Sequence, residues 1–166
     1  MTPEEPQGAG GISRRRMLKR VGAGAAVAWT APILMSVRVP AFAQSPVCRL
    51  ASHMEGEQEV PPVPTPGTGT FHGERTAPNE LHYTYSWQNL LGNAMAAHIH
   101  KAPRGMTGPS VVPQSPPSGQ SGSVSDTATV DPALLDDICA NPGEYYTNVH
   151  TDLYPGGEIR GQLQSA

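Results

Sequence analysis

The 166-residue sequence is poor in charged residues and in cysteine, and it has no long uninterrupted hydrophobic run. Charged residues make up 15% and hydrophobic residues 37% of the chain, which argues against both a charged disordered protein and a membrane bundle. The chain also lacks a G-x-S-x-G elbow, a P-loop and a Rossmann fingerprint. Basic residues are scarce after residue 43, where five Lys and Arg stand against twelve Asp and Glu. An acidic body repels phosphate, so we expect no nucleic-acid partner.

Glycine and proline, by contrast, are abundant, with 18 of each. Such a density of helix breakers favours short strands joined by many turns. The clearest strand lies at 81–88, where Leu81, Tyr83, Tyr85 and Trp87 alternate with polar residues. Further strands are predicted at 50–54, 70–75, 95–101, 144–150 and 158–163. These strands, with turn residues between them, predict an all-β fold, an antiparallel sandwich or barrel.

The remaining segments connect the strands. A stretch rich in Pro, Gly and Ser, from Lys101 to Gly122, is predicted to be a long loop. The one short helical turn is expected at 131–140, with Asp131 as N-cap and Pro132 at the first helical position. Around Tyr154-Pro155-Gly156-Gly157 the last two strands are expected to form a hairpin.

The N-terminus is typical of an export signal. Basic residues at 14–16 precede an apolar run, Val21–Met35, that ends in the small-x-small site Ala41-Phe42-Ala43. The stretch Ser13–Lys19 resembles the twin-arginine pattern S-R-R-x-F-L-K, with Met17 in place of Phe. We therefore expect residues 1–43 to be removed and residues 44–166 to form a single exported domain, periplasmic or extracellular. The alternative is an uncleaved anchor, but the apolar run falls short of the ~20 residues that span a bilayer, so no membrane span is expected in the mature form.

Two cysteines, Cys48 and Cys139, both lie in the predicted mature part. In an oxidising compartment an even pair favours one disulfide. The alternative is two separate buried thiols.

Four motifs in the mature chain resemble the CHRD (chordin-type) domain. They are Glu59-Val60-Pro61-Pro62, then Ala97–His100 with Gly105-x-x-Gly108-Pro109, then Tyr146–Thr151, and finally Pro155–Leu163. The stretch 113–123 departs from the family, which usually has a more apolar strand there. The resemblance implies an immunoglobulin-like or superoxide-dismutase-like β-sandwich, and it implies little about activity.

Strand alternation indicates how the side chains of these motifs are arranged. Residues two apart in a strand share a face, so His98 and His100 point away from Ala97 and Ile99. His150 shares a face with Tyr146 and Asn148, opposite Val149. Arg160 shares a face with Glu158 and Gln162, opposite Ile159 and Leu163. If the aliphatic residues fill the core, the three histidines and Arg160 lie on the outer surface of one sheet, where the loop 101–122 can cover them.

Three imidazoles so placed make a nitrogen ligand set suited to copper and, less well, to zinc. Copper/zinc superoxide dismutases are similar in outline, with an H-x-H strand pair, a later histidine and a nearby arginine. This chain has no evident bridging histidine and no zinc loop, so a copper-only site is the most that the pattern supports. The alternative is that His98, His100 and His150 hydrogen-bond the long loop to the sheet, with Tyr146 and Asn148 as partners, or simply lie on the surface.

Other polar residues carry weaker signals. His82 is expected to be solvated, and His53 and His72 lie in less certain strands. Arg160 is expected to form a cross-strand ion pair with Glu158 more readily than to guide an anion. The acidic residues Glu55, Glu57 and Glu59 are read as one solvated strand edge.

Three hypotheses follow. The first is an exported binding module with a copper site at His98, His100 and His150. The second is a copper-only, superoxide-dismutase-like enzyme with Arg160 steering the anion. The third is a metal-free structural domain that contacts another envelope or extracellular protein.

Overall fold

The computed structural model describes residues 47–114 and 118–166. The predicted signal at 1–43 lies outside the described residues, so export stays a prediction. The strands are β1 (Arg49–Glu55), β2 (Thr68–Ala77), β3 (Glu80–Gln88), β4 (Ala94–Lys101), β5 (Ser110–Gln114), β6 (Gly122–Thr129), β7 (Tyr145–Thr151), β8 (Ile159–Gln162) and β9 (Gln164–Ser165). Helix α2 (Pro132–Ala140) and two 3₁₀ turns, Gly56–Gln58 and Pro142–Glu144, complete the described secondary structure.

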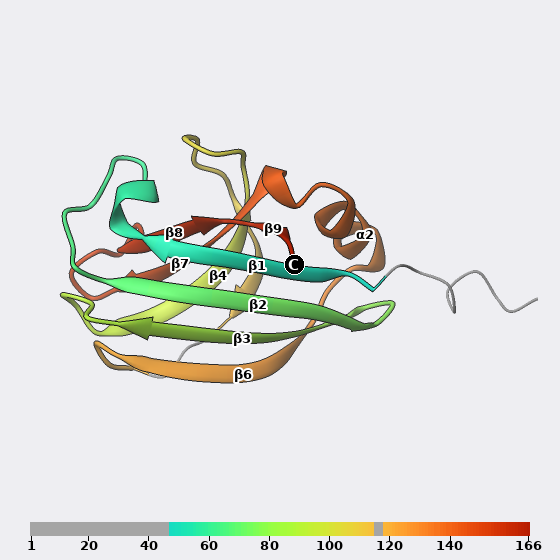
Figure 1. The fold of residues 1–166 in the computed structure, drawn as a ribbon, viewed down its shortest axis with the longest axis horizontal. Coiled ribbons are helices and arrows are strands. Elements are labelled where there is room, and N and C mark those ends of the chain that lie inside the picture. Colours follow the sequence, from blue (N-terminus) through green and yellow to red (C-terminus); the bar gives the residue numbers. More distant parts are fainter. Residues whose placement is uncertain (1–46, 115–117) are drawn as a thin grey trace, which may run out of the picture. The chain divides into compact units, whose positions relative to one another are not determined.

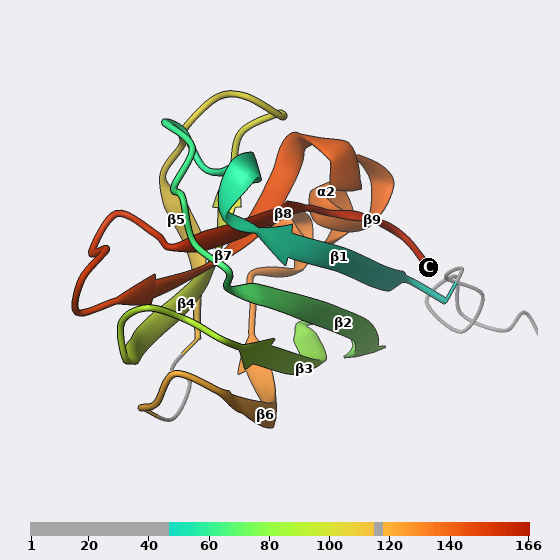
Figure 2. The ribbon, with the colours of Figure 1, turned by 60° about the vertical axis from the view of Figure 1, so that its left-hand side comes forward.

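All the strands belong to one antiparallel sheet, with the order β5-β4-β7-β8-β1-β2-β3-β6 and β9 paired to β1 (Figures 1 and 2). The sheet curves so strongly that β5 and β6, at its two ends, come into contact. The prediction of an antiparallel all-β fold with one short helix is confirmed, as a nearly closed barrel or sandwich. The finer likeness to immunoglobulin or superoxide dismutase domains stays a prediction.

Alternation along the strands fills the interior. The predicted apolar face of β3 is buried, with Leu81 and Tyr85 fully covered. Phe71 of β2 packs its ring edge-on against Tyr85, with ring centroids 5.1 Å apart. From the other half of the sheet, Ile99 and Val149 reach the same core. Apolar burial on this scale is the main favourable contribution to folding.

Helix α2 begins where the sequence predicts. The side chain of Asp131 accepts hydrogen bonds from the backbone N–H groups of Ala133 and Leu134, at 2.9 and 3.2 Å. Cys139 of this helix forms the predicted disulfide with Cys48, just before β1, so the separate-thiol alternative is wrong. A disulfide fits an oxidising compartment.

The predicted loop from Lys101 to Gly122 is partly wrong, because it contains strand β5. Pro113 hid this strand, since proline cannot donate to a ladder. β5 tolerates it because β5 lies at one end of the strand order and pairs with β4 alone. Residues 102–109 remain a loop, which we call the strap. In both views it lies on the same side of β8 as the segment 56–66 (Figures 1 and 2).

The acidic residues Glu55, Glu57 and Glu59 do not share a strand, which corrects the expectation of one solvated edge. Only Glu55 belongs to β1, while Glu57 lies in the following 3₁₀ turn. Glu59 is buried, at 7% exposure. Within the described residues, no helix is long and apolar enough to cross a membrane.

Candidate metal site

The three predicted histidines come together on the neighbouring strands β4 and β7. In the antiparallel register, Ala96 lies opposite His150 and His98 lies opposite Asn148. The nitrogens that His98, His100 and His150 can offer to a metal all lie within 4.8 Å of one another. Ala97, Ile99 and Val149, which alternate with them, are fully buried in the core. The predicted parity of both strands is therefore confirmed.

Two main-chain carbonyls orient the imidazole rings. His100 Nδ1 lies 2.8 Å from the Gly108 oxygen, and His150 Nδ1 lies 2.9 Å from the Pro155 oxygen. A carbonyl only accepts, so each Nδ1 carries the proton and each Nε2 presents a bare lone pair. His98 Nδ1 faces His150 Nε2 at 2.9 Å. Because His150 Nε2 is a bare acceptor, His98 Nδ1–H donates to it, and the lone pair of His98 lies on Nε2.

The surroundings keep the rings neutral. Burial, together with the neighbouring His150 and His100, lowers the pKa of His98 to about 4. Burial also lowers the pKa of His100 and of His150, although hydrogen bonds to the two carbonyls act in the opposite direction. A neutral imidazole is the form that ligates metals.

Arg160 and Tyr146 lie directly beside the cluster. The Arg160 guanidinium lies 3.5 Å over the Tyr146 ring, and that ring stacks on His100 with centroids 4.8 Å apart. Arg160 also donates to the strap, to the carbonyls of Met106 at 2.8 Å and Pro103 at 3.2 Å. It shares the face of the histidines, as predicted, but it is 1% exposed because the strap covers it.

The predicted ion pair of Arg160 with Glu158 is absent from the described residues. Glu158 is fully buried and instead accepts backbone N–H bonds from Leu91 at 2.6 Å and Gly92 at 3.1 Å. The hydroxyls of Thr65 and Thr151 donate to it as well, at 2.7 and 2.9 Å. Glu158 therefore ties loops together next to the turn that carries Pro155, and it does not balance the charge of Arg160.

Glu59 is the site residue that strand alternation missed. It lies beside Asn148 and Arg160. Burial raises its pKa to about 7, although the Arg160 charge and the nearby Asn148 amide both act to lower it. The signal for this position was the motif Glu59-Val60-Pro61-Pro62, because prolines so close to a strand end indicate that the chain leaves the sheet.

Three buried polar atoms at this place have no hydrogen-bond partner: Glu59 Oε1, His100 Nε2 and Asn148 Oδ1. Asn148 joins them, because its side chain contacts both Glu59 and His100. Buried polar atoms are nearly always paired, so such a group calls for an explanation. When Glu59 is ionised, all three act as acceptors, and a cation or a hydrogen-bond donor satisfies them.

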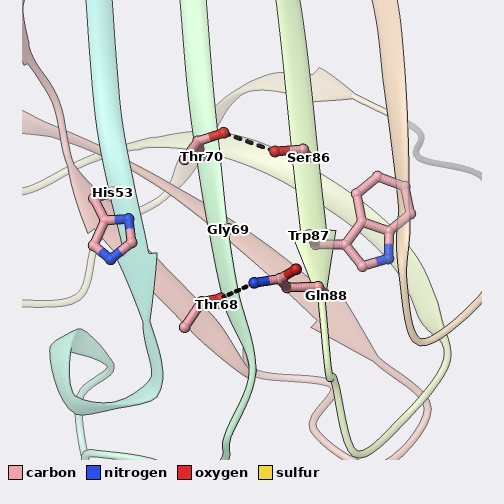
Figure 3. A pocket seen from close by; sticks show the side chains of 7 residues that line it. All are labelled: His53, Thr68, Gly69, Thr70, Ser86, Trp87 and Gln88. Atoms are coloured by element: carbon pink, nitrogen blue, oxygen red, sulfur yellow. Dashed lines mark hydrogen bonds between the residues drawn. The ribbon is translucent and has the colours of Figure 1, made fainter.

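The other histidines of the described chain lie apart from this cluster. His53 lines an open pocket on the outside of β1, β2 and β3, together with Thr68, Gly69, Thr70, Ser86, Trp87 and Gln88 (Figure 3). The polar groups there bond to one another, as Thr70 does with Ser86 at 2.7 Å. His53 bonds Glu55, and His82 bonds Thr127. His72 is exposed, and none of these three histidines belongs to a group that could hold a metal.

These features define an all-β antiparallel domain with one disulfide and a partly buried histidine cluster beneath a loop. The sequence matches the model of the CHRD domain over residues 50–163. The chain therefore belongs to the CHRD domain family. No curated protein and no solved structure matches it.

Proposed function

We propose that this chain is an exported CHRD-family binding module that holds copper, or less favourably zinc, at His98, His100 and His150. The observation that carries the proposal is the orientation of His100 and His150. Each donates Nδ1–H to a main-chain carbonyl and thereby directs Nε2 toward the cluster. Hydrogen bonds of this kind fix the tautomer of metal-ligating histidines.

The donor set fits the ion. Three neutral imidazoles suit copper and zinc, and they leave a coordination position open. Metal–nitrogen bonds are about 2 Å long, so nitrogens that share one ion lie roughly 3.5 Å apart. The widest nitrogen spacing, within 4.8 Å, therefore has to close by up to about 1.3 Å when the ion binds. The buried, unpartnered Nε2 of His100 gains a partner when the ion binds. A bound copper ion would supply one-electron chemistry, and a bound zinc ion would supply Lewis acidity.

Metal binding explains more than loop attachment does. If the histidines only held the strap and the neighbouring turn, the bonds to Gly108 and Pro155 would suffice. Loop attachment leaves the inward Nε2 of His100 unexplained. The enzyme hypothesis gains less support, because the guanidinium of Arg160 is buried and donates to strap carbonyls. Anion steering is expected from an exposed cation.

The direct experiment is a calorimetric titration of the purified, disulfide-bonded protein with Cu(II) and with Zn(II). We expect one ion per chain and a rise in melting temperature, since a ligand of the native state stabilises it. His98→Gln and His150→Gln should each weaken binding at least tenfold. His82→Gln is the matched control, because His82 is exposed and lies outside the cluster. Equal metal affinity for the wild type and all three variants, or no metal binding by the wild type, would rule out the proposed site.

The same samples separate binding from catalysis. The binding proposal predicts that the copper-loaded protein dismutates superoxide no faster than an equal concentration of free copper. A rate well above free copper that is lost in Arg160→Lys would favour the enzyme instead. For export, the N-terminal residue of the protein from its native host is the readout, with Gln44 as the expected first residue.

A further inference from the structure

Buried hydrogen-bond acceptors without partners lie beside the histidine cluster. Glu59 Oε1 and Asn148 Oδ1 are buried without partners, next to the unpartnered Nε2 of His100. The side chains are well covered, with exposures of 7% for Glu59 and 1% for Asn148. Neither oxygen has access to bulk water, so each has a hydrogen-bonding capacity that only a molecule or ion within the site can use.

The absence of a side chain at Gly157 permits the close approach of Glu59 and Asn148. Gly157 has φ of 123°, a conformation that favours glycine. A Cβ on this residue would overlap Glu59 Oε1 and would lie 2.8 Å from Asn148 Nδ2. Only glycine therefore allows the carboxylate and the amide to approach each other here, in the turn that also supplies the Pro155 carbonyl to His150.

Arg160, the cation beside Glu59, does not donate a hydrogen bond to the unpartnered oxygens of Glu59 and Asn148. Arg160 lies beside Glu59, but its hydrogen bonds run to the Met106 and Pro103 carbonyls and to Gln162. Its guanidinium face is covered by the Tyr146 ring at 3.5 Å. The positive charge of Arg160 therefore lies near Glu59, but the hydrogen bonds that Arg160 donates go to the strap and to Gln162.

We propose that Glu59 and Asn148 determine which ligands the site accepts: cations and hydrogen-bond donors enter, and anions that can only accept are rejected. The proposal rests on the proposed metal site and identifies the class of ligand that shares it. A protic neutral molecule such as water satisfies both oxygens, whereas an anion such as azide faces a carboxylate and an amide oxygen. Glu59 is on this account a specificity-determining residue and not a metal ligand.

The test is an azide titration of the Cu(II)-loaded protein, followed by the azide-to-copper charge-transfer absorption. At a pH of about 8.5, where Glu59 is ionised, wild-type protein should bind azide weakly, with a Kd of about 10 mM or more, because like charges repel strongly in a partly buried site. Glu59→Gln keeps the size of the side chain, removes the charge and offers an N–H donor. It should raise azide affinity by about tenfold or more.

Two further variants complete the design. Glu59→Asp keeps the charge and should exclude azide as the wild type does, which makes it the second test if Glu59→Gln does not fold. Glu57→Gln is the matched control, because Glu57 is exposed in the adjacent 3₁₀ turn, and it should leave azide affinity unchanged. Equal azide affinity in wild type and Glu59→Gln, or tight azide binding to both carboxylate forms, would overturn this proposal while copper binding still stands. Failure of copper to bind at all would instead overturn the proposed function.

Discussion

At the scale of single residues, the site depends on polar groups that are buried without full partners. Glu59 is the most informative of them, because burial raises the pKa of its carboxyl from 4.5 to about 7. A carboxyl whose pKa is higher in the folded state stabilises the fold most when it is protonated. Its contribution is complete below the unfolded value and is lost as the pH rises through the folded value.

This gives a prediction for the metal-free protein. Between pH 4.5 and about 7, the free energy of unfolding of the wild type should fall relative to that of Glu59→Gln. The relative loss should reach about 3 kcal/mol at most, since each pKa unit corresponds to about 1.4 kcal/mol. Comparing the two proteins removes any contribution from other groups that both share. Denaturant unfolding at several pH values, in the presence of a chelator, measures it. Parallel pH profiles for the two proteins would show that Glu59 does not carry the dependence.

At the scale of elements, the strap is held to the sheet mainly by side-chain donors. His100, Arg160 and Gln162 donate to carbonyls of the strap, among them those of Gly108, Met106 and Ala102. The strap contributes little apolar burial, and Met106 at its tip is 58% exposed. A metal at His100 Nε2 keeps the proton on Nδ1 and so strengthens the bond to Gly108, which couples the strap to the ion.

Gly108→Ala tests this coupling. A Cβ at position 108 would overlap the carbonyl oxygen of Lys101, so the strap has to shift and release His100. We expect the affinity for copper to fall about tenfold, in line with the loss of an outer hydrogen bond to a metal ligand. Trypsin should cut after the exposed Arg104 faster in the variant, and metal should slow the cut in the wild type.

Gly143→Ala is the control for that experiment, because a Cβ there meets no atom within 4 Å. It should leave both the affinity and the cleavage rate unchanged. If the rate of cleavage after Arg104 in the wild type is the same with and without metal, the strap and the ion are independent.

The elements also show what the sequence could and could not predict. Alternation in β4 and β7 was sufficient to bring the three histidines to one face, because parity is a local property. The helix start at Asp131 was local as well. Glu59 was misplaced because the chain leaves the strand after Glu55, and Glu158 was misassigned because its partners, Thr65, Leu91 and Gly92, are more than 60 residues away in the sequence. Such long-range contacts leave no periodic signal.

At the scale of the whole molecule, one covalent bond closes most of the domain into a loop. Cys48 and Cys139 are 91 residues apart, and their disulfide ties α2 to the start of β1. Closing a loop of this length lowers the entropy of the unfolded chain, a stabilisation of about 4 kcal/mol. We expect reduction to lower the free energy of unfolding by about that amount.

Denaturant unfolding with and without reductant measures the contribution, and alkylation followed by mass analysis counts the free thiols. The oxidised protein should show none. Coincident unfolding curves for the oxidised and reduced protein would contradict the expectation. Because the ligand strands β4 and β7 are not the strands that the disulfide anchors, metal affinity measured under native conditions should change little on reduction.

The central claim is that His98, His100 and His150 bind one metal ion, the latter two through Nε2. Imidazole ¹⁵N NMR spectra of the protein during addition of Zn(II) test this claim most directly, because they report each ring nitrogen separately. The account predicts that Nδ1 of His100 and His150 stays protonated, and that Nε2 of both rings and one nitrogen of His98 shift together up to one equivalent of zinc. Unchanged resonances of these three rings, or shifts confined to His53, His72 and His82, would contradict it.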